Sequence, residues 1–180
     1  MHRRQFVIAN EIIELWNFNH INIGKNLYLS YDKDLQIKII ENNCGKSYIL
    51  GHAFQIDPNR REPENEIKDV ENVLDCIKTW SGRYVLIHNE YLYMDACGML
   101  GCFYYNEKDK ILVSSSSAIL NSIIKSDENE YIPIEHGYGM DWYPGPCTKF
   151  KCISRLLPNQ IISFNKNKSN KTEIEIIFLN

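Results

Sequence analysis

Cysteine and histidine are side chains that act together in nucleophilic chemistry, and the chain holds six cysteines and five histidines. Cys44 stands in the tripeptide Asn43-Cys44-Gly45, and a nucleophile there would need His52 or His136 beside it as a base. Such a pair requires proximity in space and a lowered pKa of the thiol. The tripeptide also makes a natural turn. We favour the turn, and therefore expect no catalytic residue.

Two cysteine pairs share one spacing, Cys97 with Cys102 and Cys147 with Cys152, which raises the question of a zinc site. The gap of four residues is at the loose end of structural zinc spacing, and no His-rich or Gly-rich knuckle surrounds either pair. We therefore expect no metal and no other cofactor. Without an export signal, all six cysteines are expected to stay reduced: Cys44, Cys76, Cys97, Cys102, Cys147 and Cys152.

The composition is that of an ordinary globular domain. The 180 residues suffice for one core, and 44% are hydrophobic and 24% charged. A net charge of -3 offers no basic field to nucleic acid or anionic lipid, and no stretch reaches membrane-spanning length. Arg3-Arg4 resembles a twin-arginine export signal, but Glu11 and Glu14 interrupt the apolar segment after it. We expect a single cytoplasmic domain that begins with an ordinary strand or helix.

Alternating patterns predict the strands that come first. Strands are expected at 27–31, 35–39 and 48–54, and the polar turn Asp32-Lys33-Asp34 separates the first two. Their order along the chain suggests a meander in one antiparallel sheet. The stretch 57–63 is polar and contains two prolines, which predicts a surface loop.

From Glu64 to Ile77, apolar residues recur at helical spacing, which predicts one helix with a face on a sheet, closed by Gly82. A short second helix is expected over 118–124, capped by Ser116 or Ser117. Many antiparallel strands with few helices favour an α+β fold of two packed sheets with helices on their outer faces. Hairpin loops are expected at 88–90 and 106–110, and later strands at 84–87, 92–94, 102–105, 111–113, 160–164 and 173–178.

The segment from His136 to Pro146 is polar and aromatic. Its glycines and prolines predict a folded loop, and the alternative is that its aromatic side chains form a partner interface.

Five segments, in order, carry a resemblance to a known family. Ser81–Ile87 is similar to its GRFALI strand, and Tyr93–Gly98 to its D-x-x-G turn. Phe103–Tyr105 resembles its PLYY strand, Val113–Ser115 its ASS segment, and Leu156–Asn159 its LPPG or LPNH turn. From Trp80 to Phe164 the chain thus resembles the N-terminal glutamine amidotransferase domain of the asparagine synthetase family. The resemblance implies the Ntn hydrolase fold, a four-layer αββα sandwich of two mainly antiparallel sheets with outer helices.

The residues of these segments also have structural roles that elementary chemistry predicts. Gly98 is expected to supply a backbone conformation that other residues avoid, and Asp95 to accept backbone N–H bonds in the same turn. Phe103, Tyr104 and Tyr105 are expected to pack in a sheet.

The family's catalytic elements are missing. Active members carry at position 2 a cysteine whose thiol attacks the glutamine amide and whose terminal amine is the base, whereas this chain has His2. The chain has no Asn-Gly pair of the kind that forms the family's oxyanion hole. Asn65-Glu66 stands near the family's acidic SDTE-like segment without its serine and aspartate. The chain therefore resembles the noncatalytic version in β-lactam synthetase and the lasso-peptide cyclases.

In complete members this domain precedes an ATP-pyrophosphatase domain with an SGGxDS loop, which residues 1–180 do not contain. The resemblance therefore implies a single amidotransferase-like domain, 1–180, without the synthetase domain. Its expected partner is a separately encoded adenylating ligase that acts in amide-bond formation, and a homo-oligomer is compatible with the same sequence. The alternative is a thiol-dependent glutamine amidotransferase or Ntn-type hydrolase with an unconventional nucleophile, for which Cys44 is the candidate.

Overall fold

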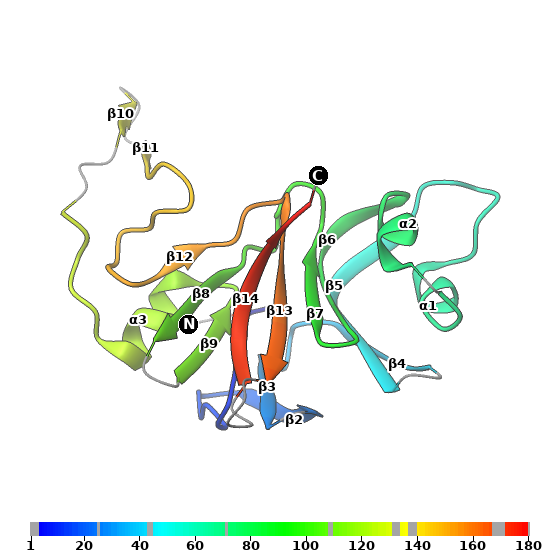
Figure 1. Ribbon diagram of the computed structural model, residues 1–180, viewed down its shortest axis with the longest axis horizontal. Coiled ribbons are helices and arrows are strands. Elements are labelled where there is room, and N and C mark those ends of the chain that lie inside the picture. The colour runs from blue at the N-terminus through cyan, green and yellow to red at the C-terminus, as the bar shows by residue number, and fades with distance from the viewer. Residues whose placement is uncertain are drawn as a thin grey trace.

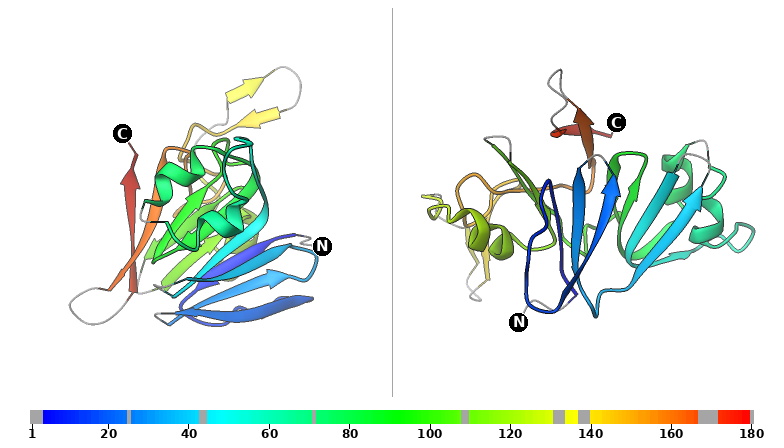
Figure 2. Two further views of the ribbon diagram at one scale, coloured as in Figure 1. Left: turned by 90° about the vertical axis from the view of Figure 1, so that its right-hand side faces the viewer. Right: turned by 90° about the horizontal axis from the view of Figure 1, so that it is seen from below.

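The computed structural model describes residues 4–24, 26–42, 45–70, 72–107, 110–130, 134–136, 140–166 and 172–179. The described strands form two six-stranded antiparallel sheets and a two-stranded ribbon, and the described helices are short (Figures 1 and 2). The α+β class predicted from the sequence is confirmed.

The first sheet is built around β1 (Phe6–Ala9), whose four residues are all fully buried. An apolar run of this length is typical of a strand that is covered on both faces. β1 lies between β3 (Leu27–Asp32) and β9 (Lys110–Ser114), and Ser114 Oγ at the end of β9 donates to the carbonyl of Phe6, 108 positions earlier. In spatial order the sheet consists of β12 (Ser154–Arg155), β8 (Phe103–Glu107), β9 (Lys110–Ser114), β1, β3 (Leu27–Asp32) and β2 (Phe18–Gly24).

The second sheet is joined largely by hairpins. The hairpin of β6 (Trp80–His88) and β7 (Tyr91–Met94) turns at Asn89 and Glu90, whose φ values of 45° and 73° are those that a two-residue hairpin turn requires. The hairpin predicted at 88–90 is confirmed. In spatial order the sheet consists of β14 (Thr172–Phe178), β13 (Gln160–Lys166), β7 (Tyr91–Met94), β6 (Trp80–His88), β5 (Gly45–Gln55) and β4 (Ile37–Asn42).

The meander predicted over 27–54 is wrong, although its three strands exist. β3 pairs with β1 and β2 in the first sheet, whereas β4 pairs with β5 in the second. The chain passes from the first sheet to the second just after Asp32, which is held by two backbone hydrogen bonds. Its N–H donates to the Gln5 carbonyl and its own carbonyl accepts the N–H of Leu35, both at 2.9 Å. The turn at Asp32-Lys33-Asp34 is a corner that passes the chain from one sheet to the other.

A hydrophobic core forms between the two sheets. Phe6, Ile8 and Leu29 of the first sheet lie in one buried cluster with Leu50 and Val85 of the second. Since side chains alternate across a strand, the neighbours of these residues point away from this core. Each sheet therefore has a second apolar face to cover.

The other face of the first sheet is covered by α3 (Ser117–Ile124). Val7 and Leu112 of the sheet form a buried cluster with Ile119 and Leu120 of the helix. The hydroxyl of Ser116 accepts the N–H of Ile119, so Ser116 is the N-cap. The short helix predicted over 118–124 and its cap are confirmed.

The single helix predicted from Glu64 is two helices, α1 (Pro63–Glu66) and α2 (Val73–Ile77). Asn72 is extended, and its side-chain oxygen accepts the N–H of Leu74 at 3.1 Å, so it begins α2 as an N-cap. The apolar spacing in the sequence gives no sign of this break, because Ile67 before it and Val73 after it both pack on the outer face of the second sheet. Gly82 lies inside β6 and closes no helix.

The segment predicted as a loop from His136 to Pro146 begins in the two-stranded ribbon. β10 (Ile134–His136) and β11 (Met140–Trp142) are antiparallel, with Glu135 opposite Asp141.

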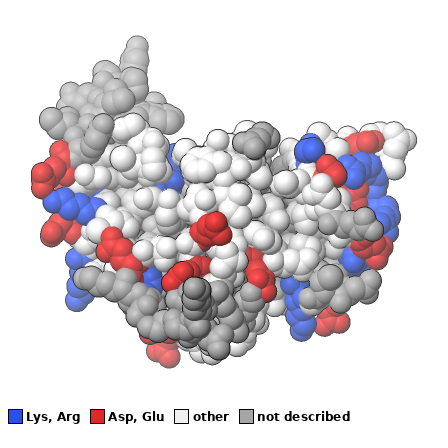
Figure 3. Space-filling model, viewed as in Figure 1, with Lys and Arg blue, Asp and Glu red and all other residues white. Residues whose placement is uncertain are grey.

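Charged side chains of both signs are interspersed on the face shown in Figure 3, mostly toward its sides and lower edge. This mixture agrees with the net charge of -3 and forms no continuous basic patch on that face. No helix in the described ranges is long and apolar enough to cross a membrane.

Candidate functional site

The start of β1 is the place where an N-terminal nucleophile would act in the family that the sequence resembles. His2 lies outside the described residues. The hydroxyl of Ser115 accepts the N–H of Phe6 at 2.9 Å and donates to Gln5 Oε1 at 2.7 Å. Asp32 is buried, and its Oδ1 accepts the N–H of Arg4 at 2.9 Å. The Ser115 proton is thus held by an amide oxygen rather than by a base.

A cleft of about 750 Å³, the end cleft, opens between the sheets where β2 turns into β3. Leu27 lines it from the first sheet, and Lys46, Tyr48 and Glu90 line it from the second. Burial raises the pKa of Tyr48 against the opposing effect of Lys46, so the phenol is a neutral donor at physiological pH. The end cleft can hold a small polar molecule, and its described walls contain no thiol, imidazole or serine hydroxyl.

Cys44, the alternative nucleophile, lies outside the described residues, as does the side chain of His136. Gly45, the next residue, begins β5 and lines the end cleft. His52 lies on the same extended strand, about 23 Å from Gly45 at about 3.3 Å per residue.

A buried serine and histidine form a cross-strand pair in the second sheet. Ser47 Oγ lies 2.7 Å from His88 Nδ1, and the side-chain amide of Asn89 lies 2.8 Å from His88 Nε2. With the Asn89 amide nitrogen as the donor, Nε2 accepts and Nδ1–H donates to Ser47. Burial lowers the pKa of His88, which keeps the imidazole neutral. Since Ser47 is 0% exposed and His88 5% exposed, this pair lies inside the fold and links β5 to β6.

Because the pKa of His88 is lower in the folded than in the unfolded chain, its contribution to stability is present above the unfolded value of about 6.5. That contribution is lost as the pH falls toward the folded value, since the unfolded state binds the extra proton. We expect the free energy of unfolding to fall by up to about 1.4 kcal/mol per pH unit in this window. Urea denaturation at several pH values between about 7 and about 5 measures the slope.

The His88→Gln variant should show a shallower slope than the wild type over that range. His52→Gln is the matched control, because it removes an exposed histidine of the neighbouring strand. Equal slopes for the wild type and His88→Gln would contradict the assignment.

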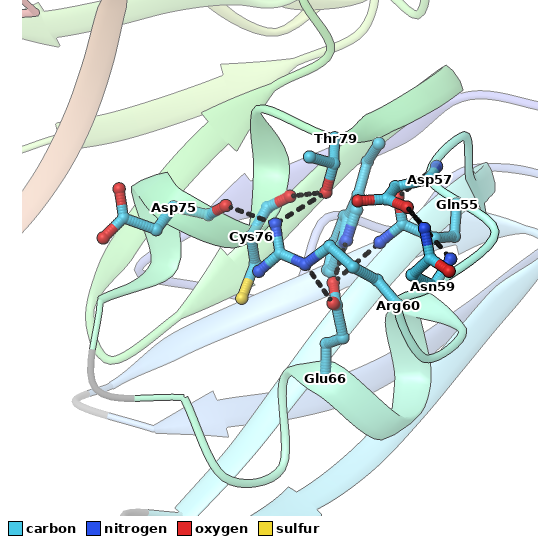
Figure 4. Close-up of polar contacts among 9 residues, drawn as sticks. Gln55, Asp57, Asn59, Arg60, Glu66, Asp75, Cys76 and Thr79 are labelled. Atoms are coloured by element: carbon cyan, nitrogen blue, oxygen red, sulfur yellow. Dashed lines mark hydrogen bonds and ion pairs between the residues drawn. The ribbon is translucent and has the colours of Figure 1, made fainter.

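A buried carboxylate lies on the outer side of the second sheet (Figure 4). Glu66 is 7% exposed, and it accepts the Nε1–H of Trp80 at 2.7 Å and the Nε2–H of Gln55 at 3.0 Å. Arg60 Nε pairs with its other oxygen at 2.9 Å. The same guanidinium donates to Thr79 Oγ1 at 3.0 Å. We call these five residues the Glu66 cluster.

The Glu66 cluster fastens α1 and the preceding loop to β5, β6 and the end of α2. The loop predicted at 57–63 is therefore attached by Arg60, whose side chain is only about a third exposed. Glu66 stands near the family's acidic segment in sequence, yet both of its oxygens are engaged within the fold. The burial of Glu66 had one indication in the sequence, since Glu66 shares a helical face with the apolar residues Pro63 and Ile67. All three are buried.

No disulfide joins the described cysteines, which lie in unlike surroundings. Cys97 and Cys152 are exposed, whereas Cys102 is fully buried in the core between the sheets. Burial raises the pKa of Cys102, which makes this thiol unreactive in the folded state. Within the described ranges no group of three or more His, Cys, Asp or Glu side chains could hold a metal ion.

The turn after β7 has the structure that its sequence predicts. Asp95 is buried, and its carboxylate accepts the N–H of Cys97 at 3.0 Å and that of Met99 at 3.0 and 3.1 Å. Gly98 has a φ of +61°, in the left-handed region that favours glycine. Both predicted structural roles are confirmed.

The chain matches no protein-family model, and a search of curated proteins finds no match.

Proposed function

We propose that this chain is a noncatalytic amidotransferase-like domain of the Ntn hydrolase type that associates with a separately encoded asparagine synthetase-like ligase. The ligase would use ATP to activate a carboxylate for amide-bond formation. The proposal makes the fold a four-layer αββα sandwich, with α3 over one sheet and α1 and α2 over the other.

The observation that carries the proposal is the order of the five family-like segments along the two sheets. The order is that of the sequence landmarks: strand, D-x-x-G turn, strand, serine-rich strand end and proline turn. Ser81–Ile87 lies in β6, Tyr93–Gly98 in β7 and its turn, Phe103–Tyr105 in β8, Val113–Ser115 at the end of β9, and Leu156–Asn159 before β13.

Two observations support the noncatalytic character. The family's reactive residues are replaced in this sequence, and the carboxylate near its acidic segment is bonded within the fold. His2 stands where a cysteine would be, and no Asn-Gly pair is present. The Glu66 carboxylate is bound by Trp80, Gln55 and Arg60. A domain with these substitutions retains a framework on which another protein could dock.

The connection between β1 and β2 offers the most exposed aromatic side chain among the large hydrophobic residues in the described ranges. Trp16 is 79% exposed, and Ile12 on the same connection is 49% exposed. Tryptophan is enriched among the residues that dominate binding energy at interfaces. We assign the ligase contact to this connection.

Two measurements test the proposal. The purified chain should release ammonia from glutamine no faster than buffer does. Tagged chain expressed in its own cells should retain a protein that catalyses ATP–pyrophosphate exchange, and Trp16→Ala should reduce that retained activity by at least about tenfold. Met99→Ala is the matched control, because Met99 is also 62% exposed but lies on another turn.

The alternative, a thiol-dependent enzyme, predicts glutamine hydrolysis that iodoacetamide blocks. Cys44→Ala would abolish that activity and Cys97→Ala would retain it, and this result would refute the noncatalytic proposal. Capture of no adenylating activity by the wild-type chain would refute the docking role.

A further inference from the structure

A second cavity, the outer cavity, lies on the outer side of the second sheet and has a volume of about 370 Å³. It is bordered by α2, by β7 and its following turn, and by the chain after β14. Its walls are mostly apolar side chains, among them Leu74, Ile77, Ile161 and Leu179. Small-molecule sites in proteins are typically apolar cavities of about 300–1,000 Å³ with a few converging polar groups. The outer cavity is at the small end of that range.

Three polar side chains that are more than nine-tenths buried line the outer cavity. Tyr84 is 1% exposed, Gln160 5% and Tyr93 7%. Neither phenol hydroxyl has a hydrogen-bond partner among the residues that the structure describes. Gln160 Oε1 accepts the N–H of Leu157 at 2.9 Å, and its NH₂ group has no partner in the same part of the chain. The polar ends of these three are not among the fully enclosed unbonded side-chain atoms of the described residues, so they are accessible from the cavity and free to bond a ligand there.

The three polar ends present donors. Burial raises the pKa of Tyr93 to about 12, and burial together with the Asp95 carboxylate raises that of Tyr84 further. Both phenols therefore keep their protons at physiological pH. The group that they would bind is a hydrogen-bond acceptor.

The charges around the outer cavity favour a neutral acceptor over a carboxylate. The negative charge of Asp95 acts on Tyr84, at the polar wall of the cavity. Lys78 is the one lining cation among the described residues, and it is largely exposed and pairs with Asp75 at 3.0 Å. An anion inside would be desolvated without a partner. Water alone is a poor occupant, because one molecule fills about 30 Å³ and the walls are mostly apolar.

We propose that the outer cavity is a binding site for a small, neutral, mostly apolar molecule whose carbonyl oxygen accepts hydrogen bonds from Tyr84, Tyr93 and Gln160. The apolar part of the ligand packs between α2 and the C-terminal Leu179. The ligand-binding proposal for the outer cavity does not depend on the proposed docking of a ligase.

Phenylacetamide and phenylacetate form a matched pair of probes, because they share one shape and differ in the charge of the head. Titration of the isotope-labelled full chain by NMR should give saturable shifts with phenylacetamide at the amides of Ala96, Ile161 and Leu179. Phenylacetate should bind at least about tenfold more weakly. Ala96→Phe, which adds a ring at the exposed rim of the cavity, should abolish the shifts.

Tyr84→Phe and Tyr93→Phe remove the donors and keep the ring volume, and each should weaken phenylacetamide about two- to tenfold. Tyr104→Phe is the matched control, since Tyr104 lies on β8 of the first sheet and does not line the cavity, and the affinity of this variant should equal that of the wild type. The proposal is overturned by the absence of saturable shifts. It is equally overturned by unchanged affinity in both cavity variants, or by phenylacetate binding as tightly as phenylacetamide. The glutamine and capture experiments are unaffected by any of these results.

Discussion

Glu66→Gln should lower the free energy of unfolding by about 2–4 kcal/mol, because the buried carboxylate is held by three donors. A neutral amide presents its NH₂ group to a donor and leaves the Arg60 guanidinium without its counter-charge. Urea denaturation monitored by tryptophan fluorescence measures the change, and Trp80, whose Nε1 donates to this carboxylate, is one of the three tryptophans that report it.

The matched control is Asp69→Asn. Asp69 also pairs with an arginine, Arg61, at 3.1 Å, but both side chains are more than half exposed. Exposed pairs contribute about 0–1 kcal/mol, so this variant should unfold close to the wild type. If the two variants lose equal stability, the Glu66 cluster does not fasten α1 to the sheet.

Gly82→Ala should destabilise the chain by about 3–5 kcal/mol, with the same result for Gly51→Ala. A Cβ on Gly82 would lie 2.1 Å from the His52 carbonyl oxygen, and one on Gly51 would lie 2.3 Å from that of Arg83. The opposing atoms are backbone of the paired strand, so the clash cannot be relieved by moving a side chain. Both glycines also have positive φ, +132° and +93°.

Gly24→Ala separates the steric clash from the backbone strain. Gly24 has a φ of +100°, but a Cβ there would meet nothing within 4 Å. We expect a loss of about 1–2 kcal/mol in urea denaturation, clearly smaller than that of Gly82→Ala. Similar losses at both positions would mean that β5 and β6 can separate enough to admit a side chain.

The sequence predicts those parts of the fold that depend on neighbouring residues. The β6–β7 turn, the cap at Ser116 and the Asp95 turn follow from local hydrogen bonds and local φ values, and each was predictable. Strand pairing depends on partners far along the chain. For this reason the strands at 27–32 and 37–42 were found but placed in one sheet, whereas a corner at Asp32 separates them.

Two further features escaped prediction for a physical reason. β2 is an edge strand with no fully buried residue, so Phe18–Gly24 carries little of the apolar alternation that marks a strand. The Glu66 cluster joins Gln55, Arg60 and Trp80, which come from a strand end, a loop and the next strand. Each is unremarkable in its own segment, and only the folded chain brings them together.

The position of β1 between β3 and β9 also bears on the order in which the protein can assemble during its synthesis. At about 5–20 residues per second, a ribosome needs on the order of 5–20 seconds to make the roughly one hundred residues that separate β1 from its second neighbour. Until β9 emerges, one edge of an entirely apolar strand has no partner. The nascent chain therefore carries an exposed Phe-Val-Ile-Ala edge that chaperones or rapid completion must protect.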